Sequence, residues 1–90
     1  MSDSYRAKRA LQISPSGFVL DGGTGESFSI NKTGAVILAT FVEGRSLDDA
    51  VQALATEYEL PLPAARRDTM RFVTELARMG LLVPREAPDA

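Results

Sequence analysis

The sequence contains no cysteine and no histidine. Without cysteine there is no disulfide, no thiolate nucleophile and no cysteine-based zinc site. Without histidine, the chain lacks the side chain best suited to proton transfer near neutral pH and the commonest metal ligand. We therefore predict a protein that is not an enzyme and that has no catalytic residue, metal site or cofactor. Paired carboxylates remain as a catalytic alternative, but the acidic pairs at residues 48–49 and 57–59 have the pattern of surface positions.

Long apolar runs are also missing. A transmembrane helix needs roughly 20 apolar residues, whereas the longest run here is Ala35 to Ala39. The first ten residues lack the apolar stretch of a secretory signal, so we predict a cytoplasmic protein with no membrane partner. The net charge of −2 at pH 7 argues against broad electrostatic attachment to nucleic acid.

Three short segments in the first third of the 90 residues have the pattern of β-strands. They are Leu11–Ile13, Phe18–Leu20 and Glu26–Ile30, and turn residues separate them. The glycine-rich segment Gly22–Gly25 joins two strands, so it favours a hairpin turn over a phosphate loop, which leads from a strand into a helix. We predict a three-stranded antiparallel meander. Its inner face is expected to carry Leu11, Ile13, Phe18, Leu20, Phe28 and Ile30.

Three helices are predicted after the strands, because the apolar period changes to that of a helix. Asn31 or Thr33 is expected to cap the first helix and Ser46 the second, since their side chains can accept from free backbone N–H groups. Gly44 and Gly80 stand where a left-handed residue ends a helix. The predicted helices run from the first cap to about Glu43, from Leu47 to Tyr58, and from about Ala64 to Met79.

The two ends of the chain are polar and predict no regular structure. We expect residues 1–10 and 84–90 to be flexible tails and residues 11–83 to form one domain. Strands followed by helices predict an α+β domain in which the helices cover one face of a small sheet.

The predicted strand Glu26–Ile30 ends the meander and so forms a sheet edge. Such edges are normally blocked by proline, lysine or a bulge, and this segment has none of them. Its outward side chains, Ser27 and Ser29, are too small to obstruct an incoming chain. The edge is therefore a candidate for binding an extended peptide as an added strand. The alternatives are an edge covered by the chain's own tail or by a second copy in a homodimer.

Arginines follow one face of the third predicted helix. Arg67, Arg71 and Arg78, with Thr74 between them, recur at helical spacing. This face is either a solvated surface neutralised by nearby acidic residues or a cationic edge for an acidic ligand. The last two helices also fit a helix-turn-helix of a winged-helix DNA-binding protein, but the isoelectric point of about 5.0 disfavours that alternative.

Three motifs in order give the chain a resemblance to a known family. Residues 30–34, Ile-Asn-Lys-Thr-Gly, lead into an apolar helix, and residues 44–49, Gly-Arg-Ser-Leu-Asp-Asp, lead into the next one. The closing helix has an Asp before a Phe-x-x-x-Leu-x-x-x-Gly-Leu-Leu run at residues 72–82. Together the motifs resemble the family of the pyrroloquinoline quinone biosynthesis chaperone D, from about Phe18 to Val83.

The resemblance implies a winged-helix-like recognition domain that serves enzymes making modified peptides. Members bind the leader of a ribosomally made precursor as an added antiparallel strand, between the third strand and the third helix. They then present it to a partner, either a radical S-adenosylmethionine protein or a leader peptidase. Phe28, Ile30, Phe72 and Met79 would mainly form the floor of the site. The residues expected to bind the peptide are Ser27, Phe28, Ser29, Ile30, Arg67, Met70, Arg71, Thr74 and Arg78.

Overall fold

The computed structural model describes residues 5–88. Its elements are β1 (Tyr5–Ala7), β2 (Leu11–Ile13), β3 (Phe18–Asp21), β4 (Ser27–Ser29), α1 (Lys32–Val42), α2 (Leu47–Tyr58), α3 (Leu62–Arg78) and β5 (Leu82–Pro84). The predicted α+β class is confirmed, because the antiparallel sheet β2–β3–β4 is followed by three helices. Within residues 5–88, none of the helices combines the length and the apolar content that a membrane span requires.

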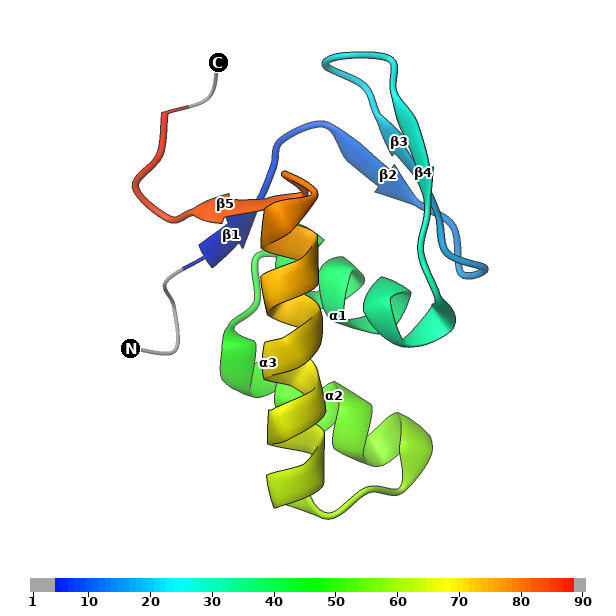
Figure 1. The fold of residues 1–90 in the computed structure, drawn as a ribbon, viewed down its shortest axis with the longest axis vertical. Helices are drawn as coiled ribbons and strands as arrows, with labels where there is room; N and C mark the ends of the chain where they lie inside the picture. The colour runs from blue at the N-terminus through cyan, green and yellow to red at the C-terminus, as the bar shows by residue number, and fades with distance from the viewer. Residues whose placement is uncertain (1–4, 89–90) are drawn as a thin grey trace.

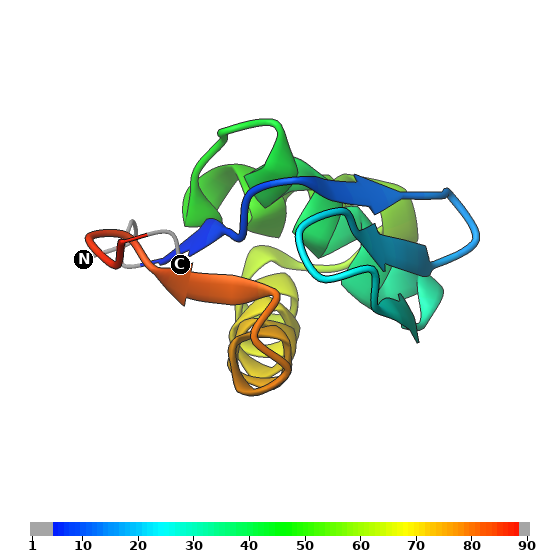
Figure 2. The ribbon, with the colours of Figure 1, turned by 90° about the horizontal axis from the view of Figure 1, so that it is seen from above.

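The helices form the body of the molecule, and the sheet β2–β3–β4 extends from one end of it. In Figure 1, α3 runs along the long axis, with the sheet at the upper right and the α2–α3 turn at the opposite end. Figure 2 shows α3 end-on, with the β1–β5 pair on one side and the three-stranded sheet on the other. The strand β4 and the helix α3 therefore border the same side of the molecule.

The two ends of the chain pair with each other. Residues Tyr5–Ala7 form an antiparallel ladder with Leu82–Pro84, and the Arg6 side chain donates hydrogen bonds to the carbonyls of Arg85 and Ala87. The prediction of two flexible tails is therefore wrong for these residues; residues 1–4 and 89–90 lie outside the described range. Neither segment has a strand pattern of its own in the sequence, and the two form strands because tertiary packing brings them together.

The strand β3 faces the opposite way from the prediction. Val19 and Asp21 are buried, whereas Phe18 is 52% exposed and Leu20 37% exposed. Phe18, Val19 and Leu20 are all apolar, so the alternation of this segment does not show which side is inner. The register decides it, since Ile13 pairs with Val19 and both face the helices. A shift of one residue reverses every side chain in a strand.

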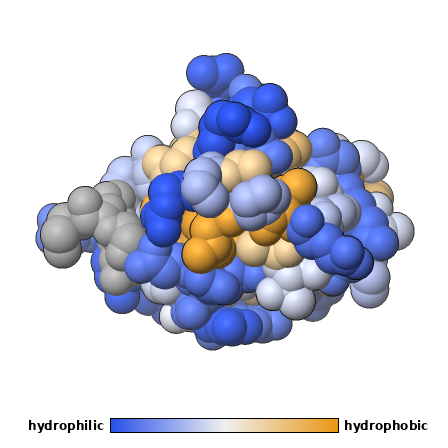
Figure 3. Space-filling view, turned by 90° about the horizontal axis from the view of Figure 1, so that it is seen from below, coloured by the Kyte–Doolittle hydropathy of each residue, from blue (hydrophilic) through white to orange (hydrophobic). Residues whose placement is uncertain are grey.

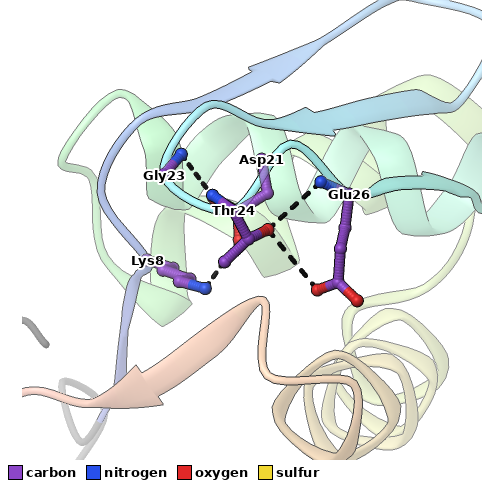
Figure 4. A network of polar contacts seen from close by, with 5 residues as sticks. All are labelled: Lys8, Asp21, Gly23, Thr24 and Glu26. Carbon is purple, nitrogen blue, oxygen red and sulfur yellow. Dashed lines mark hydrogen bonds and ion pairs between the residues drawn. The ribbon is translucent and has the colours of Figure 1, made fainter.

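The inward position of Asp21 is stabilised by a polar network (Figure 4). Lys8 Nζ donates to Asp21 Oδ2 at 2.6 Å, while the N–H groups of Gly23 and Thr24 donate to Asp21 Oδ1 at 2.9 and 3.3 Å. The hydrogen bond from Lys8 lowers the pKa of Asp21 from its ordinary value against the opposing effect of burial, and the two backbone donors add to the lowering. The Thr24 hydroxyl accepts from the Glu26 N–H at 3.2 Å. The network therefore fixes the β3–β4 turn and the start of β4.

Side-chain caps start the first two helices. Of the two predicted caps for α1, the structure selects Asn31, whose Oδ1 accepts from the Gly34 N–H at 2.8 Å. In α2, the predicted cap Ser46 forms a capping box with Asp49, with both hydrogen bonds at 3.1 Å. These caps satisfy backbone donors that have no partner inside a helix. The helix boundaries are thus set by local residues, as the sequence indicates.

The core lies where α1 meets the other two helices and the sheet. The helix α3 begins at Leu62, two residues before its predicted start, and proline is tolerated in its first turn. The Thr69 hydroxyl on α3 is buried and has no hydrogen-bond partner among the described residues. The largest fully buried apolar side chains are Val19, Ile37, Leu38, Val51, Leu54, Val73, Leu81 and Leu82.

The Asp21 network predicts a specific dependence of stability on pH. A carboxylate whose folded pKa is lowered stabilises the fold above its unfolded pKa of about 3.9, and this stabilisation is lost as pH falls through the folded pKa. We expect Asp21→Asn to lower the melting temperature at pH 7 and to differ less from the parent below about pH 4. Thermal unfolding followed by circular dichroism between pH 2 and 8 measures this. The matched control is Glu57→Gln at an exposed carboxylate, and an equal effect of both variants would contradict the role of Asp21.

Gly17 is required by close packing against the end of β4. Its φ is +97°, and a Cβ there would overlap the carbonyl oxygen of Ile30. Gly25 shares a positive φ of +80° but would meet no atom within 4 Å. We expect Gly25→Ala to cost about 1 kcal/mol of unfolding free energy for the strained backbone, and Gly17→Ala to cost clearly more. Urea unfolding of the two variants tests this, and equal losses would show that the overlap is relieved without cost.

Candidate functional site

One edge of the three-stranded sheet is open. In the sheet order β2–β3–β4, no described strand pairs with the outer edge of β4. On its inner edge, the Ile30 N–H donates to the Gly17 carbonyl at 2.8 Å, and the Asp21 N–H donates to the Glu26 carbonyl at 2.8 Å. These two hydrogen-bonded pairs determine which residue pairs of the β3–β4 ladder are hydrogen-bonded and which are not.

The alternation determines which backbone groups face the open edge. Bonded and non-bonded pairs alternate in an antiparallel ladder, so Phe28 bonds to Val19, with which it is paired. Ser27 and Ser29 belong to the non-bonded pairs, and their N–H and C=O groups therefore point away from β3. Both serine side chains are exposed and leave these groups accessible. The open edge thus offers two donors and two acceptors at the spacing that an added strand needs.

A hollow of about 230 Å³ lies between the end of β4 and α3. We call it the β4–α3 groove. Its apolar lining comes mainly from α3, while the start of α1 contributes backbone and the capping side chain. The groove is lined by Ser29, Ile30, Asn31, Gly34, Phe72, Glu75, Leu76 and Met79. An extended chain on the open edge would have every second side chain directed toward this groove.

Two of the predicted arginines border the groove. The guanidinium carbon of Arg71 lies 5.6 Å from the ring centroid of Phe72, close enough for a cation–π interaction. Arg78 pairs with Glu75, a groove residue, at 3.3 Å. Arg71 also lies 3.7 Å from an Asp68 carboxylate oxygen. The cations therefore stand at the rim with acidic neighbours, so the rim is close to neutral.

The other three predicted helix residues lie outside the groove lining. Met70 and Thr74 are each two positions from Phe72, which places them about 200° around the helix from it. Both are exposed, and the Thr74 hydroxyl donates to the Met70 carbonyl at 3.0 Å. Arg67 is exposed and lies 3.8 Å from an Asp68 oxygen. The contact of these residues with a peptide stays a prediction.

Four groove residues were missing from the predicted set: Asn31, Gly34, Glu75 and Leu76. Asn31 had shown only its role as a helix cap, and Leu76 had shown only its place in the motif of the closing helix. The i, i+3 spacing of Glu75 and Arg78 indicated only that both lie on one face of the helix, and not that this face borders the groove. Among the predicted strand residues, Ser29 and Ile30 reach the groove lining, whereas Ser27 and Phe28 belong to β4 but not to the lining.

A larger hollow of about 400 Å³ lies elsewhere, beside the turn between β1 and β2. Its lysine and one of its arginines are already engaged, since Lys8 binds Asp21 and Arg6 binds the carbonyls of Arg85 and Ala87. Across residues 5–88, no three acidic, histidine or cysteine side chains come together as metal ligands. The β4–α3 groove is therefore the stronger candidate site, because it adjoins unpaired backbone groups.

The fold defines a class of small domains in which an open sheet edge lies beside a groove lined by a helix. The chain belongs to the family of coenzyme PQQ synthesis protein D (PqqD), whose family model matches residues 17–82. The predicted resemblance is confirmed. Among curated protein sequences, none matches this chain.

Two solved structures are similar over nearly the whole chain. The first is described as lasso peptide synthetase B1 complexed with the leader peptide; it is 31% identical, covers 90% of this chain and 99% of its own, and has a TM-score of 0.67. The second is TbiB1 in complex with the TbiA(beta) leader peptide; it is 26% identical, covers 93% and 99%, and has a TM-score of 0.70.

Proposed function

We propose that this protein is a non-catalytic recognition domain for a leader peptide. It binds the leader of a ribosomally synthesised precursor as a strand added to β4, and it presents the attached core to a modifying enzyme. The observation that carries the proposal is the open edge of β4, where the backbone groups of Ser27 and Ser29 face outward beside the β4–α3 groove. Both similar structures are complexes with a leader peptide, which supports the proposal.

The open edge and the groove have separate roles in binding. Main-chain hydrogen bonds to Ser27 and Ser29 provide affinity that is independent of the leader sequence, while the groove selects side chains. Phe72, Leu76 and Met79 make the groove apolar, so it suits an aliphatic or aromatic side chain of the leader. Because a flexible leader loses entropy when it is ordered, we expect dissociation constants on the order of micromolar or below.

The arginines at the rim adjust specificity. Arg71 stacks on Phe72 and already has Asp68 as a neighbour. An acidic leader residue near Arg71 would share this cation with Asp68, and an exposed pair contributes only about 0–1 kcal/mol. Charge therefore favours acidic leaders modestly, and the main selection comes from shape and apolar contact. Arg67, Met70 and Thr74 would contact only a leader that continues over α3.

We assign the modification or cleavage of the precursor peptide to a partner enzyme. The two candidate classes are a radical S-adenosylmethionine protein and a leader peptidase, both acting in the cytoplasm. A homodimer through the β4 edges would compete with the leader for the same backbone groups. Sizing by light scattering across dilution, with and without leader, separates the two, because a leader-binding edge stays monomeric when free.

Duplex DNA binding is the alternative for a winged-helix-like chain. It needs a basic surface, whereas the arginines on α3 stand beside Asp68 and Glu75. Affinity for DNA would fall steeply with salt, while strand addition in a groove would change little. A salt series with a labelled duplex and a labelled leader distinguishes them.

Ser29→Pro tests the open edge. Proline removes the outward N–H and its ring occupies the edge, so we expect loss of leader binding. The far-ultraviolet circular dichroism should remain that of the parent. The measurement is fluorescence anisotropy with the labelled leader of the precursor, which we expect to be encoded near this gene. Ser29→Ala is the matched control, since it keeps the backbone donor. Unchanged binding by the folded Ser29→Pro protein would refute strand addition at β4.

Arg71→Glu tests the rim. For a leader with an acidic residue at the groove, we expect affinity to fall about tenfold, which corresponds to about 1.4 kcal/mol. A leader with that residue changed to glutamine should be affected less. Arg66→Glu is the control on the same helix, because Arg66 is exposed and lies 3.5 Å from Asp48 on α2. Equal losses for both variants would mean that only overall charge matters.

A further inference from the structure

The outer face of the three-stranded sheet is uncharged and partly apolar. It is the face turned away from the helices, and its large side chains are Phe18, 52% exposed, and Leu20, 37% exposed. A hollow of about 290 Å³ on this face is lined in part by the same two residues. The outward-facing side chains are Gln12, Phe18, Leu20, Ser27 and Ser29.

The serines of β4 leave the two apolar side chains accessible from the open edge. Phe18 pairs with Ser29, and Leu20 pairs with Ser27. Both are non-bonded pairs, in which the Cα atoms approach to about 4.5 Å. A serine side chain is too short to cover a neighbouring phenylalanine or leucine. The apolar surface of β3 therefore continues, across the serines, to the edge where a strand would add.

We propose that Phe18 and Leu20 are specificity-determining residues that bind the outward-facing side chains of the leader. The inference rests on the proposed function, because it requires the leader on β4. Adjacent strands are about 4.8 Å apart, so an added strand lies about 10 Å from β3. Side chains opposite Ser29 and Ser27 lean over these serines and contact Phe18 and Leu20. The expected ligands are therefore leaders with apolar residues at the two positions opposite Ser27 and Ser29.

The contacts with Phe18 and Leu20 predict a pattern of apolar residues in the leader sequence. The leader residue opposite Phe28 faces the groove side, while its two neighbours face Phe18 and Leu20. A strand that is buried on both faces has consecutive apolar residues rather than an alternating pattern. We therefore expect three successive apolar residues in the bound segment of the leader.

The size and place of the patch favour the leader over another protein. Two partly exposed side chains provide far less than the 1,200–2,000 Å² or so that a stable protein interface buries. They lie one strand from the edge that the leader would occupy, so the leader extends the same surface. Neither a second copy nor an enzyme is needed to cover them.

The first experiment identifies the leader residue opposite Ser29. The chain has no cysteine, so Ser29→Cys introduces a single thiol. Directly opposed bonded residues have Cα atoms about 5.5 Å apart, within the range that a disulfide spans. Single-cysteine variants of the same leader are then cross-linked to this thiol under oxidising conditions. The most rapidly linked position is the one opposite Ser29.

The second experiment measures coupling across the outer face. We expect Phe18→Thr to weaken leader binding about five- to tenfold, or about 1–1.4 kcal/mol, because threonine keeps the strand but loses the ring. Alanine at the leader residue opposite Ser29 should lose a similar factor, and the two losses should be non-additive in a double-mutant cycle. The control is Leu62→Gln, which changes an equally exposed side chain (47%) at the far end of the molecule.

This control samples a second apolar area. Viewed from below, the end of the molecule that carries the α2–α3 turn shows apolar side chains ringed by polar ones (Figure 3). We expect Leu62→Gln to change affinity by less than about twofold, or less than about 0.4 kcal/mol. A loss equal to that of Phe18→Thr would show a nonspecific apolar effect and overturn the proposal.

The outcomes separate this inference from the proposed function. If Ser29→Pro abolishes binding while Phe18→Thr and Leu20→Thr leave affinity unchanged, the leader binds β4 but the outer face does not read it. If these two variants bind the leader normally but slow its processing by the neighbouring enzyme, the face belongs to the enzyme, and the proposal is equally overturned. Additive losses in the double-mutant cycle would also contradict it.

Discussion

The fold depends on the junction at Ile30 and Asn31, where a strand becomes a helix within two residues. The Ile30 N–H donates to the Gly17 carbonyl at 2.8 Å and holds the end of β4 against the sheet. The Asn31 side chain then accepts from the Gly34 N–H at 2.8 Å and starts α1. Since α1 packs against both other helices, this junction fixes the position of β4 relative to α3. The groove exists because these few hydrogen bonds set that position.

The strands of the sheet β2–β3–β4 present groups inward, along the sheet and outward, and each direction has a different role. Side chains such as Val19 point inward and join the core. The backbone groups of Ser27 and Ser29 point along the sheet and form the open edge. Phe18 and Leu20 point outward, away from the helices. Strands of three or four residues have no length for further contacts, so each direction has one role. The buried Asp21, engaged by Lys8, stabilises this arrangement at the turn.

Electrostatics plays a secondary part at the site. Arg67, Arg71 and Arg78 lie beside acidic residues of the same helix at 3.3 to 3.8 Å, and these exposed pairs are individually weak. Their exchange with a ligand carboxylate therefore changes the free energy little. Apolar contact and backbone hydrogen bonding have no such competitor in the free protein. This difference is the physical reason to expect recognition by shape and strand pairing rather than by charge.

The local structure follows from residues that are neighbours in the sequence. Asn31 and Ser46 marked the helix starts because a cap needs only the residues around it, and small, unblocked serines marked the open edge. The sequence predicted that Arg67, Arg71 and Arg78 share one face of α3. It did not show which face of α3 borders the groove. That choice depends on where β4 lies, which is a long-range property of the fold.

The facing of β3 and the pairing of the chain ends depend on contacts between residues far apart in the chain. Phe18, Val19 and Leu20 are all apolar, so the sequence allows either Val19 or its two neighbours to face inward. The register with β2 places Val19 on the inner face. Tyr5–Ala7 has no strand signal of its own and becomes a strand because Leu82–Pro84 lies beside it. Local hydrogen bonds and periodicity are encoded in neighbouring residues, whereas the side that a strand buries is set by partners far away in the chain.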